Sequence, residues 1–175
     1  ALVPIGLVRN RSPRAFVASI VAGLNNGMGQ LVGVGIACAV AGLVVGTLSM
    51  ADLTGKISSG MFTLAGGSYA LTLLVATVVI ILLGMGMPTP AVYALSAVLA
   101  APALLALKIE LLPAHLFIVY FASMSAITPP VAVAAFAAAS IARANPIAVA
   151  FVACRVGIVA FVLPLLAFSP VLKAL

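Results

Sequence analysis

One stretch of this sequence is long enough and apolar enough to cross a lipid bilayer as a single helix. Residues 28–49 contain no charged side chain. At a rise of about 1.5 Å per residue, a helix of this length matches the hydrocarbon core of a bilayer, which is about 30 Å thick. Two pairs of glycines, Gly29 with Gly33 and Gly42 with Gly46, are spaced four residues apart. That spacing lets a second helix approach closely in lipid, so it predicts a spanning helix that packs through small residues.

The remainder of the chain is also too poor in charge to fold in water. Charged residues make up 6% and hydrophobic residues 66% of the sequence, whereas about a quarter of the residues in a soluble domain are charged. We therefore expect an all-α integral membrane protein. The net charge of +6 is spread over segment ends, apart from a cluster of Arg9, Arg11 and Arg14. Such a cluster is typical of a cytoplasmic loop or of a site for anionic lipid headgroups, and it does not indicate nucleic-acid binding.

Prolines, glycines and polar residues divide the sequence into further apolar segments. The first eight residues resemble the end of an earlier membrane helix, so we expect residues 1–175 to be a single transmembrane domain from a longer protein. Short helices are expected over 12–26 and 57–65. Membrane spans are expected over 28–49, 68–83, 91–107 and 147–168.

The region 116–142 has a different pattern. It consists of two apolar segments of about a dozen residues, which flank Ile-Thr-Pro-Pro at 127–130. A helix of that length reaches about 17 Å, roughly half of the hydrocarbon core. A pair of prolines cannot continue a straight helix. The sequence therefore predicts a re-entrant helical hairpin over 116–142, whose tip lies near the middle of the bilayer.

A second interruption lies at 84–90, where two glycines and two prolines fall within apolar sequence. Backbone groups freed by such a break cannot face lipid, and they are tolerated where they line a cavity. Both breaks carry hydroxyls, and neutral oxygens suit a cation such as Na+, while the start of a half-helix favours an anionic group. We therefore expect Thr89, Ser125 and Thr128 to bind Na+. The expected ion and substrate site as a whole comprises Gly84, Gly86, Thr89, Ser125, Thr128, Pro129 and Pro130.

The alternative is that both breaks are proline kinks, with the threonine hydroxyls bonded to their own backbone. Arg155 lies about nine residues into the last span, and two roles stay open for it. It has a functional role, or its side chain extends to the membrane interface or pairs with carbonyls of the hairpin. His115 is expected near the interface without a special role, and Cys38 and Cys154 as small apolar residues. With one histidine, two acids and no nucleophile or metal motif, the sequence does not indicate an enzyme.

The two interrupted motifs, with shorter matches along most of the chain, resemble the large membrane subunit of tripartite ATP-independent periplasmic (TRAP) transporters. More specifically, they resemble the C-terminal part of the fused permeases that work with TAXI-type binding proteins. The matching stretches are Gly84-Met-Gly-Met-Pro-Thr-Pro, Ile127-Thr-Pro-Pro-Val-Ala, Ala41-Gly-Leu-Val-Val-Gly, Leu64-Ala-Gly-Gly, Ala114-His-Leu-Phe, Tyr120-Phe and Arg155-Val-Gly.

The resemblance implies an elevator-type secondary transporter in the inner membrane of a bacterium or archaeon. Such a transporter is built from inverted repeats, each with one hairpin and one broken helix. The resemblance implies Na+ coupling and import of organic acids delivered by a periplasmic substrate-binding protein. The remaining half of the permease and a small membrane subunit region would be further partners. On this resemblance, 125–130 is the second hairpin tip and 84–90 the second broken helix, which together form one Na+ site and half of the substrate site.

The sequence departs from the family pattern in two respects. It contains no first repeat and no small-subunit region, so we do not expect this part alone to transport. The family has a second threonine after Pro-Thr, where this chain has Pro90, so one hydroxyl of the broken helix is absent. Two other functions stay open on the sequence: another ion-coupled organic-anion carrier with hairpin architecture, and a non-transporting membrane scaffold subunit whose breaks are kinks.

Overall fold

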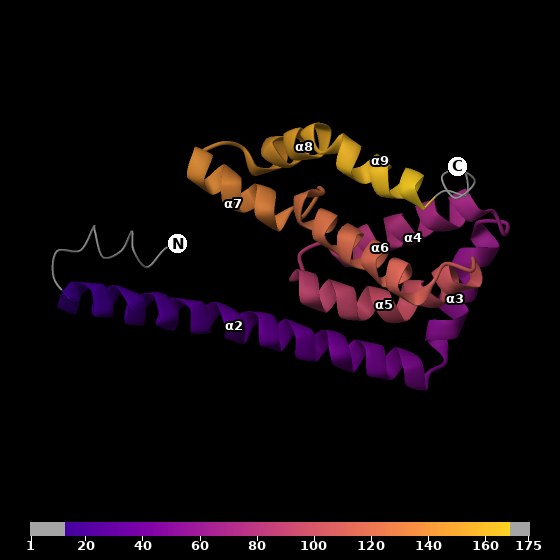
Figure 1. Cartoon of the computed structure of the whole chain (residues 1–175), viewed down its shortest axis with the longest axis horizontal. Coiled ribbons are helices and arrows are strands. Elements are labelled where there is room, and N and C mark those ends of the chain that lie inside the picture. The colour runs from indigo at the N-terminus through magenta and orange to yellow at the C-terminus, as the bar shows by residue number, and fades with distance from the viewer. Residues whose placement is uncertain (1–12, 169–175) are drawn as a thin grey trace. The chain divides into compact units, whose positions relative to one another are not determined.

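The computed structural model describes residues 13–168, and these form helices and turns with no strand. The all-α prediction is therefore confirmed for this part of the chain. Arg9, Arg11 and the expected helix end at 1–8 lie outside the described residues. The helices are α2 (Pro13–Met50), α3 (Leu53–Leu64), α4 (Tyr69–Leu83), α5 (Thr89–Ala106), α6 (Leu111–Met124), the 3-10 helix η1 (Ser125–Ile127), α7 (Val133–Ala142), α8 (Pro146–Val156) and α9 (Ile158–Ala167) (Figure 1).

Helix α2 is continuous where the sequence predicted a short helix followed by a separate span. Asn25, Asn26 and Gly27 each cost a helix about 1 kcal/mol or less, and none removes a backbone donor as proline does. The helix therefore continues through them, and the predicted span 28–49 lies within it. The chain divides into two compact units, residues 1–36 and 37–175. The elements from α3 onward belong to the second unit.

The core of the second unit lies between α4, α5 and α6, which pack against one another. Each of these helices buries apolar side chains, and α3 packs on α5, where the buried Ser58 hydroxyl donates to the Leu99 carbonyl. Helix α9 contacts α4 and α6, and the Tyr120 hydroxyl donates to the Ala160 carbonyl at 2.8 Å. The largest fully buried apolar side chains in this core are Leu73, Ile80, Val92, Leu104, Phe117, Ile118 and Phe121.

The segment 116–142 comprises α6, η1 and α7, and a re-entrant hairpin over it stays a prediction. From α6 the chain continues through η1 into α7 in one general direction, and it turns back only after α7 (Figure 1). The reversal lies between α7 and α8, which meet at 117° and pack against each other. Arg143 ends α7 in the left-handed region, with φ 51°, and Asn145 caps α8. The prolines at 129 and 130 interrupt the helix, as expected, but they do not reverse it.

The last predicted span, 147–168, is also interrupted. Gly157 separates α8 from α9, and its N–H donates to the Ala153 carbonyl at 2.8 Å. By length and composition, α5 and residues 16–50 of α2 could each cross a membrane, and the bent pair α7–α8 could form one further span or a re-entrant loop. How many of the described helices cross stays a prediction.

Candidate functional site

The first interruption, between α4 and α5, is built by glycine and proline chemistry. Helix α4 ends at the buried Gly84, whose N–H donates to the Ile80 carbonyl at 2.9 Å. Gly86 follows with φ +82°, a backbone conformation that residues with a Cβ rarely adopt. Pro88 has an extended backbone and precedes α5, and Pro90 occupies the first turn, where its missing N–H has no cost. The helix is interrupted between α4 and α5 because these glycines and prolines disfavour a continuous helix.

The second interruption follows α6. Helix α6 tightens into η1, and the chain then runs through an irregular segment with a cis peptide bond between Pro129 and Pro130 before α7 begins. Ser125, the first residue of η1, is 1% exposed. Its hydroxyl oxygen lies 2.7 Å from the Ala122 carbonyl oxygen. The Thr128 N–H donates to the Ser125 carbonyl at 3.1 Å, so η1 is a compact turn that fixes the serine.

These two interruptions meet in space. The Ser125 hydroxyl oxygen lies 3.2 Å from the carbonyl oxygen of Gly84, 41 residues away in the chain. A Cβ added to Gly84 would overlap both the Cβ and the hydroxyl oxygen of Ser125, and one added to Gly86 would lie 3.3 Å from a methyl group of Val131. The two breaks therefore touch at both glycines. We call the group formed by Gly84, Gly86, Ser125 and Val131 the break junction.

A third interruption, which the sequence analysis missed, lies beside the break junction. The Cys154 thiol donates to the Ile127 carbonyl at 3.4 Å, and a Cβ on Gly157 would lie 3.5 Å from the Ile127 side chain. Helices α4, α6, α7 and α8 all contact η1. The signal in the sequence was Gly157 itself, the single glycine in the predicted span 147–168. Three interruptions of the helices thus converge on one short 3-10 helix.

The predicted oxygen ligands differ in their surroundings. The Ser125 hydroxyl is buried between two carbonyl oxygens, those of Gly84 and Ala122. The Thr128 hydroxyl donates to the Met124 carbonyl at 2.9 Å and is only partly buried, which is the local bond expected for a proline kink. Thr89 begins α5 and is half-buried, and within the described residues its side chain makes no hydrogen bond to the second break. Pro129 is half-buried and Pro130 is exposed.

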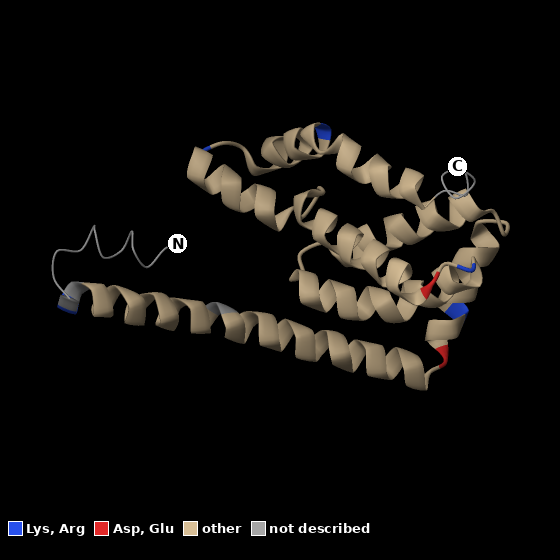
Figure 2. Cartoon of the chain, in the orientation of Figure 1, with Lys and Arg blue, Asp and Glu red and all other residues tan. Residues whose placement is uncertain are grey.

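The acidic side chains lie away from the break junction. Both acidic residues, Asp52 and Glu110, sit at the starts of α3 and α6, far from α8 (Figure 2). His115 Nδ1 lies 3.0 Å from the Tyr93 hydroxyl, which gives the imidazole a local partner. Within the part of the chain that the structure describes, no group of residues could hold a metal through histidine, cysteine or carboxylates.

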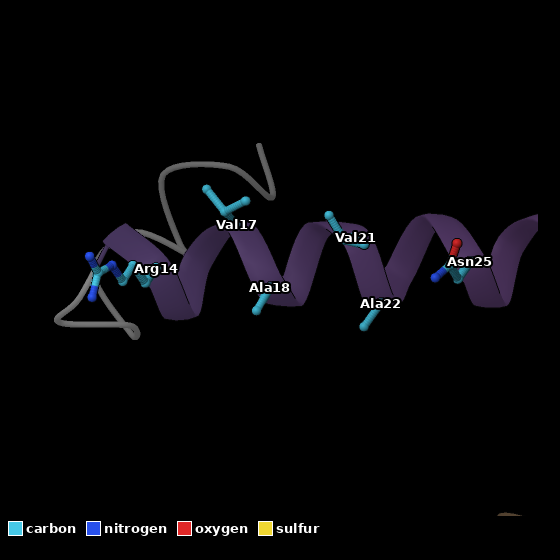
Figure 3. A pocket seen from close by; sticks show the side chains of 6 residues that line it. All are labelled: Arg14, Val17, Ala18, Val21, Ala22 and Asn25. Atoms are coloured by element: carbon cyan, nitrogen blue, oxygen red, sulfur yellow. The ribbon is translucent and has the colours of Figure 1, made fainter.

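A shallow surface hollow lies on α2, within the first unit of the chain. In Figure 3, Val17 and Val21 point to one side of the helix, and Ala18 and Ala22 point to the other. The hollow runs along one open helix face between Arg14 and Asn25. It contains no convergent polar groups, so we do not regard it as a functional site.

The model of the tripartite ATP-independent periplasmic transporter DctM component matches residues 2–174. The chain belongs to this family. DctM components are membrane permeases of transporters and not enzymes, so the expected resemblance is confirmed at the level of family and of transport. Searches of curated proteins and of solved structures gave no match.

Membership in the DctM family gives the break junction a context. In TRAP transporters the DctM component works with a periplasmic binding protein and a small membrane subunit. The break junction brings a hydroxyl and backbone carbonyls together on otherwise apolar helices.

Proposed function

We propose that this DctM-family chain is the C-terminal part of a Na+-coupled permease of the inner membrane, of the fused TAXI-type class. It would import organic acids that a periplasmic binding protein delivers, together with the other half of the permease and a small membrane subunit region. Within it, the break junction and the start of α5 would form one ion site and part of the substrate site.

The observation that carries the proposal is the contact between Gly84 and Ser125. It places two carbonyl oxygens, those of Gly84 and Ala122, within 3.2 Å of a buried hydroxyl oxygen, at the meeting point of two broken helices. A single hydroxyl hydrogen can serve only one of the two carbonyls at a time, so this pocket of oxygens has spare acceptor capacity. Neutral oxygens at a break in membrane helices are a common way to coordinate Na+.

The structure also changes the order of the candidate ligands. Ser125 is buried and faces the other break, whereas Thr128 bonds to its own helix. We therefore expect Ser125 to contribute more to ion binding than Thr128 does. Thr89 stays a proposed ligand of Na+, and the α5 N-terminus beside it would favour an anionic group of the substrate.

The test uses the complete transporter, reconstituted in liposomes with its binding protein. Losing one neutral oxygen ligand in a dry site costs about 1–3 kcal/mol, so Ser125→Ala should raise the Na+ concentration for half-maximal uptake about tenfold to hundredfold. Thr128→Val, which keeps the side-chain shape, should raise it less. The measurement is the Na+ dependence of uptake of the acid that the binding protein retains.

Two control variants separate a loss of ion binding from the general effect of removing a hydroxyl. Ser123→Ala removes an exposed hydroxyl that donates to its own helix at 2.9 Å, two residues before Ser125. Thr77→Val removes a hydroxyl in the unbroken helix α4. Both controls should leave the Na+ dependence unchanged. If Ser125→Ala and Thr128→Val behave like the controls, the breaks are structural kinks and a scaffold function gains support.

A further inference from the structure

Two hydroxyls in the core of the second unit are buried without a hydrogen-bond partner. Thr77, in the middle of α4, is 7% exposed, and Ser96, in the middle of α5, is 0% exposed. Within the described residues, neither side-chain oxygen makes a hydrogen bond. Buried polar groups in proteins are nearly always paired, and an unpaired hydroxyl destabilises a fold. These two hydroxyls therefore need a partner beyond the side chains and carbonyls around them.

A bond to the helix backbone is the usual solution for such a hydroxyl. Serine and threonine in a helix commonly bond to the carbonyl four residues earlier. Within the part of the chain that the structure describes, Thr77 and Ser96 do not make this bond. Other hydroxyls in these helices do, and they include Ser59, Thr63, Thr72, Ser123 and Ser140.

The two residues lie on the faces through which α4 and α5 meet. Residues 84–88 join the two helices, which pack against each other, so they run in opposite directions away from the break. Thr77 lies two turns before Gly84 on one face of α4, and Ser96 lies one turn after Val92 on one face of α5. A Cβ on Gly84 would lie 3.1 Å from a methyl group of Val92, so these faces touch. Both hydroxyls therefore belong to one helix contact, roughly 6–10 Å along the helices from the break.

We propose that Thr77 and Ser96 together bind one buried water molecule between α4 and α5. A hydroxyl can both donate and accept, so a bridging water satisfies two hydroxyls that do not bond to each other. Ala76 and Ala100 adjoin the two residues and are fully buried, so no larger polar side chain competes for this position. A water held in this way is a permanent part of the fold. It lies outside the proposed ion site at Ser125, and the inference does not depend on Na+ coupling.

A double-mutant cycle in the complete permease tests whether the two hydroxyls share a partner. Thr77→Val keeps the side-chain shape and removes one hydroxyl, and Ser96→Ala removes the other. The thermal midpoint Tm is measured in detergent and Na+-free buffer for wild type, both single variants and the double variant. Thr72→Val is the matched control, because Thr72 is also buried in α4 but donates to the Ser68 carbonyl at 2.8 Å.

A shared water gives a distinct pattern of stability. Each single variant should lower Tm by several degrees, because the water loses one partner and the other hydroxyl is left unpaired. The double variant should then lower Tm no further than the single variants do, whereas the losses from Thr72→Val and Ser96→Ala should add.

Two patterns overturn the proposal. If the losses from Thr77→Val and Ser96→Ala add, each hydroxyl has its own separate partner. If the single variants match or exceed the Tm of wild type, the hydroxyls are unpaired. Should a variant fail to assemble, a high-resolution map of the wild-type permease decides the question. A density peak within hydrogen-bond distance of both side-chain oxygens supports the shared water, and direct packing without such a peak overturns it.

Discussion

Gly84→Ala tests whether the two breaks pack as tightly as the structure shows. The added Cβ would overlap the hydroxyl oxygen and the Cβ of Ser125, and it would lie 3.1 Å from a methyl group of Val92. The serine hydroxyl could rotate away, but its Cβ cannot. The end of α4 would therefore have to move away from η1, which breaks the contact between the Gly84 carbonyl and the Ser125 hydroxyl.

The expected cost follows from these contacts. Overpacking of a filled interior costs about 1–3 kcal/mol, and a lost buried hydrogen bond adds about 0.5–1.5 kcal/mol. Alanine is compatible with the Gly84 backbone, which has φ −77° and ψ −8°. The substitution therefore also stabilises the fold by about 0.4–1 kcal/mol, because alanine lowers the conformational entropy of the unfolded chain. The net expectation is a loss of about 0.5–4 kcal/mol, measured as thermal stability of the complete permease in detergent.

Two further variants make the result decisive. Gly60→Ala, in the middle of α3, is the control, because its Cβ would meet no atom within 4 Å; it should be neutral or slightly stabilising. Gly84→Ala should be much less harmful in a Ser125→Gly background, since that change removes both overlapping atoms. Residues in direct contact commonly show coupling of about 0.5–3 kcal/mol. Equal stability of Gly84→Ala and Gly60→Ala, with no coupling to Ser125, would refute the break junction.

Two other predictions concern the helices themselves. Gly33→Leu and Gly46→Leu should each reduce the yield of assembled permease more than Leu43→Ile does, because bulk prevents close helix approach in lipid; equal yields, measured by size-exclusion chromatography, would contradict this. Asn145→Ala should lower stability by about 1 kcal/mol, because the Asn145 side chain accepts from the N–H groups of Ile147 and Ala148 at 3.0 and 3.2 Å. Asn145→Asp keeps the acceptor and should behave as wild type in the same thermal assay.

The sequence predicts helix ends well where local chemistry decides them. The segments 68–83 and 91–107 correspond closely to α4 and α5, since glycine and proline act on the backbone directly. The reversal after α7 could not be predicted in the same way. The prolines at 129 and 130 show that a helix stops, whereas the direction of the next helix depends on what it packs against, here α8. The prediction that a helix ends at 25–27 was wrong, because asparagine only weakens a helix and does not break it.

The candidate site could be predicted in its parts but not in its assembly. Ser125 and Gly84 each stand at a visible interruption, yet their contact joins residues 41 positions apart. That contact depends on how α4, α5 and α6 share one core, which no local pattern encodes. The contribution of Gly157 was missed for the same reason, because a lone glycine in an apolar segment is often tolerated inside a continuous helix.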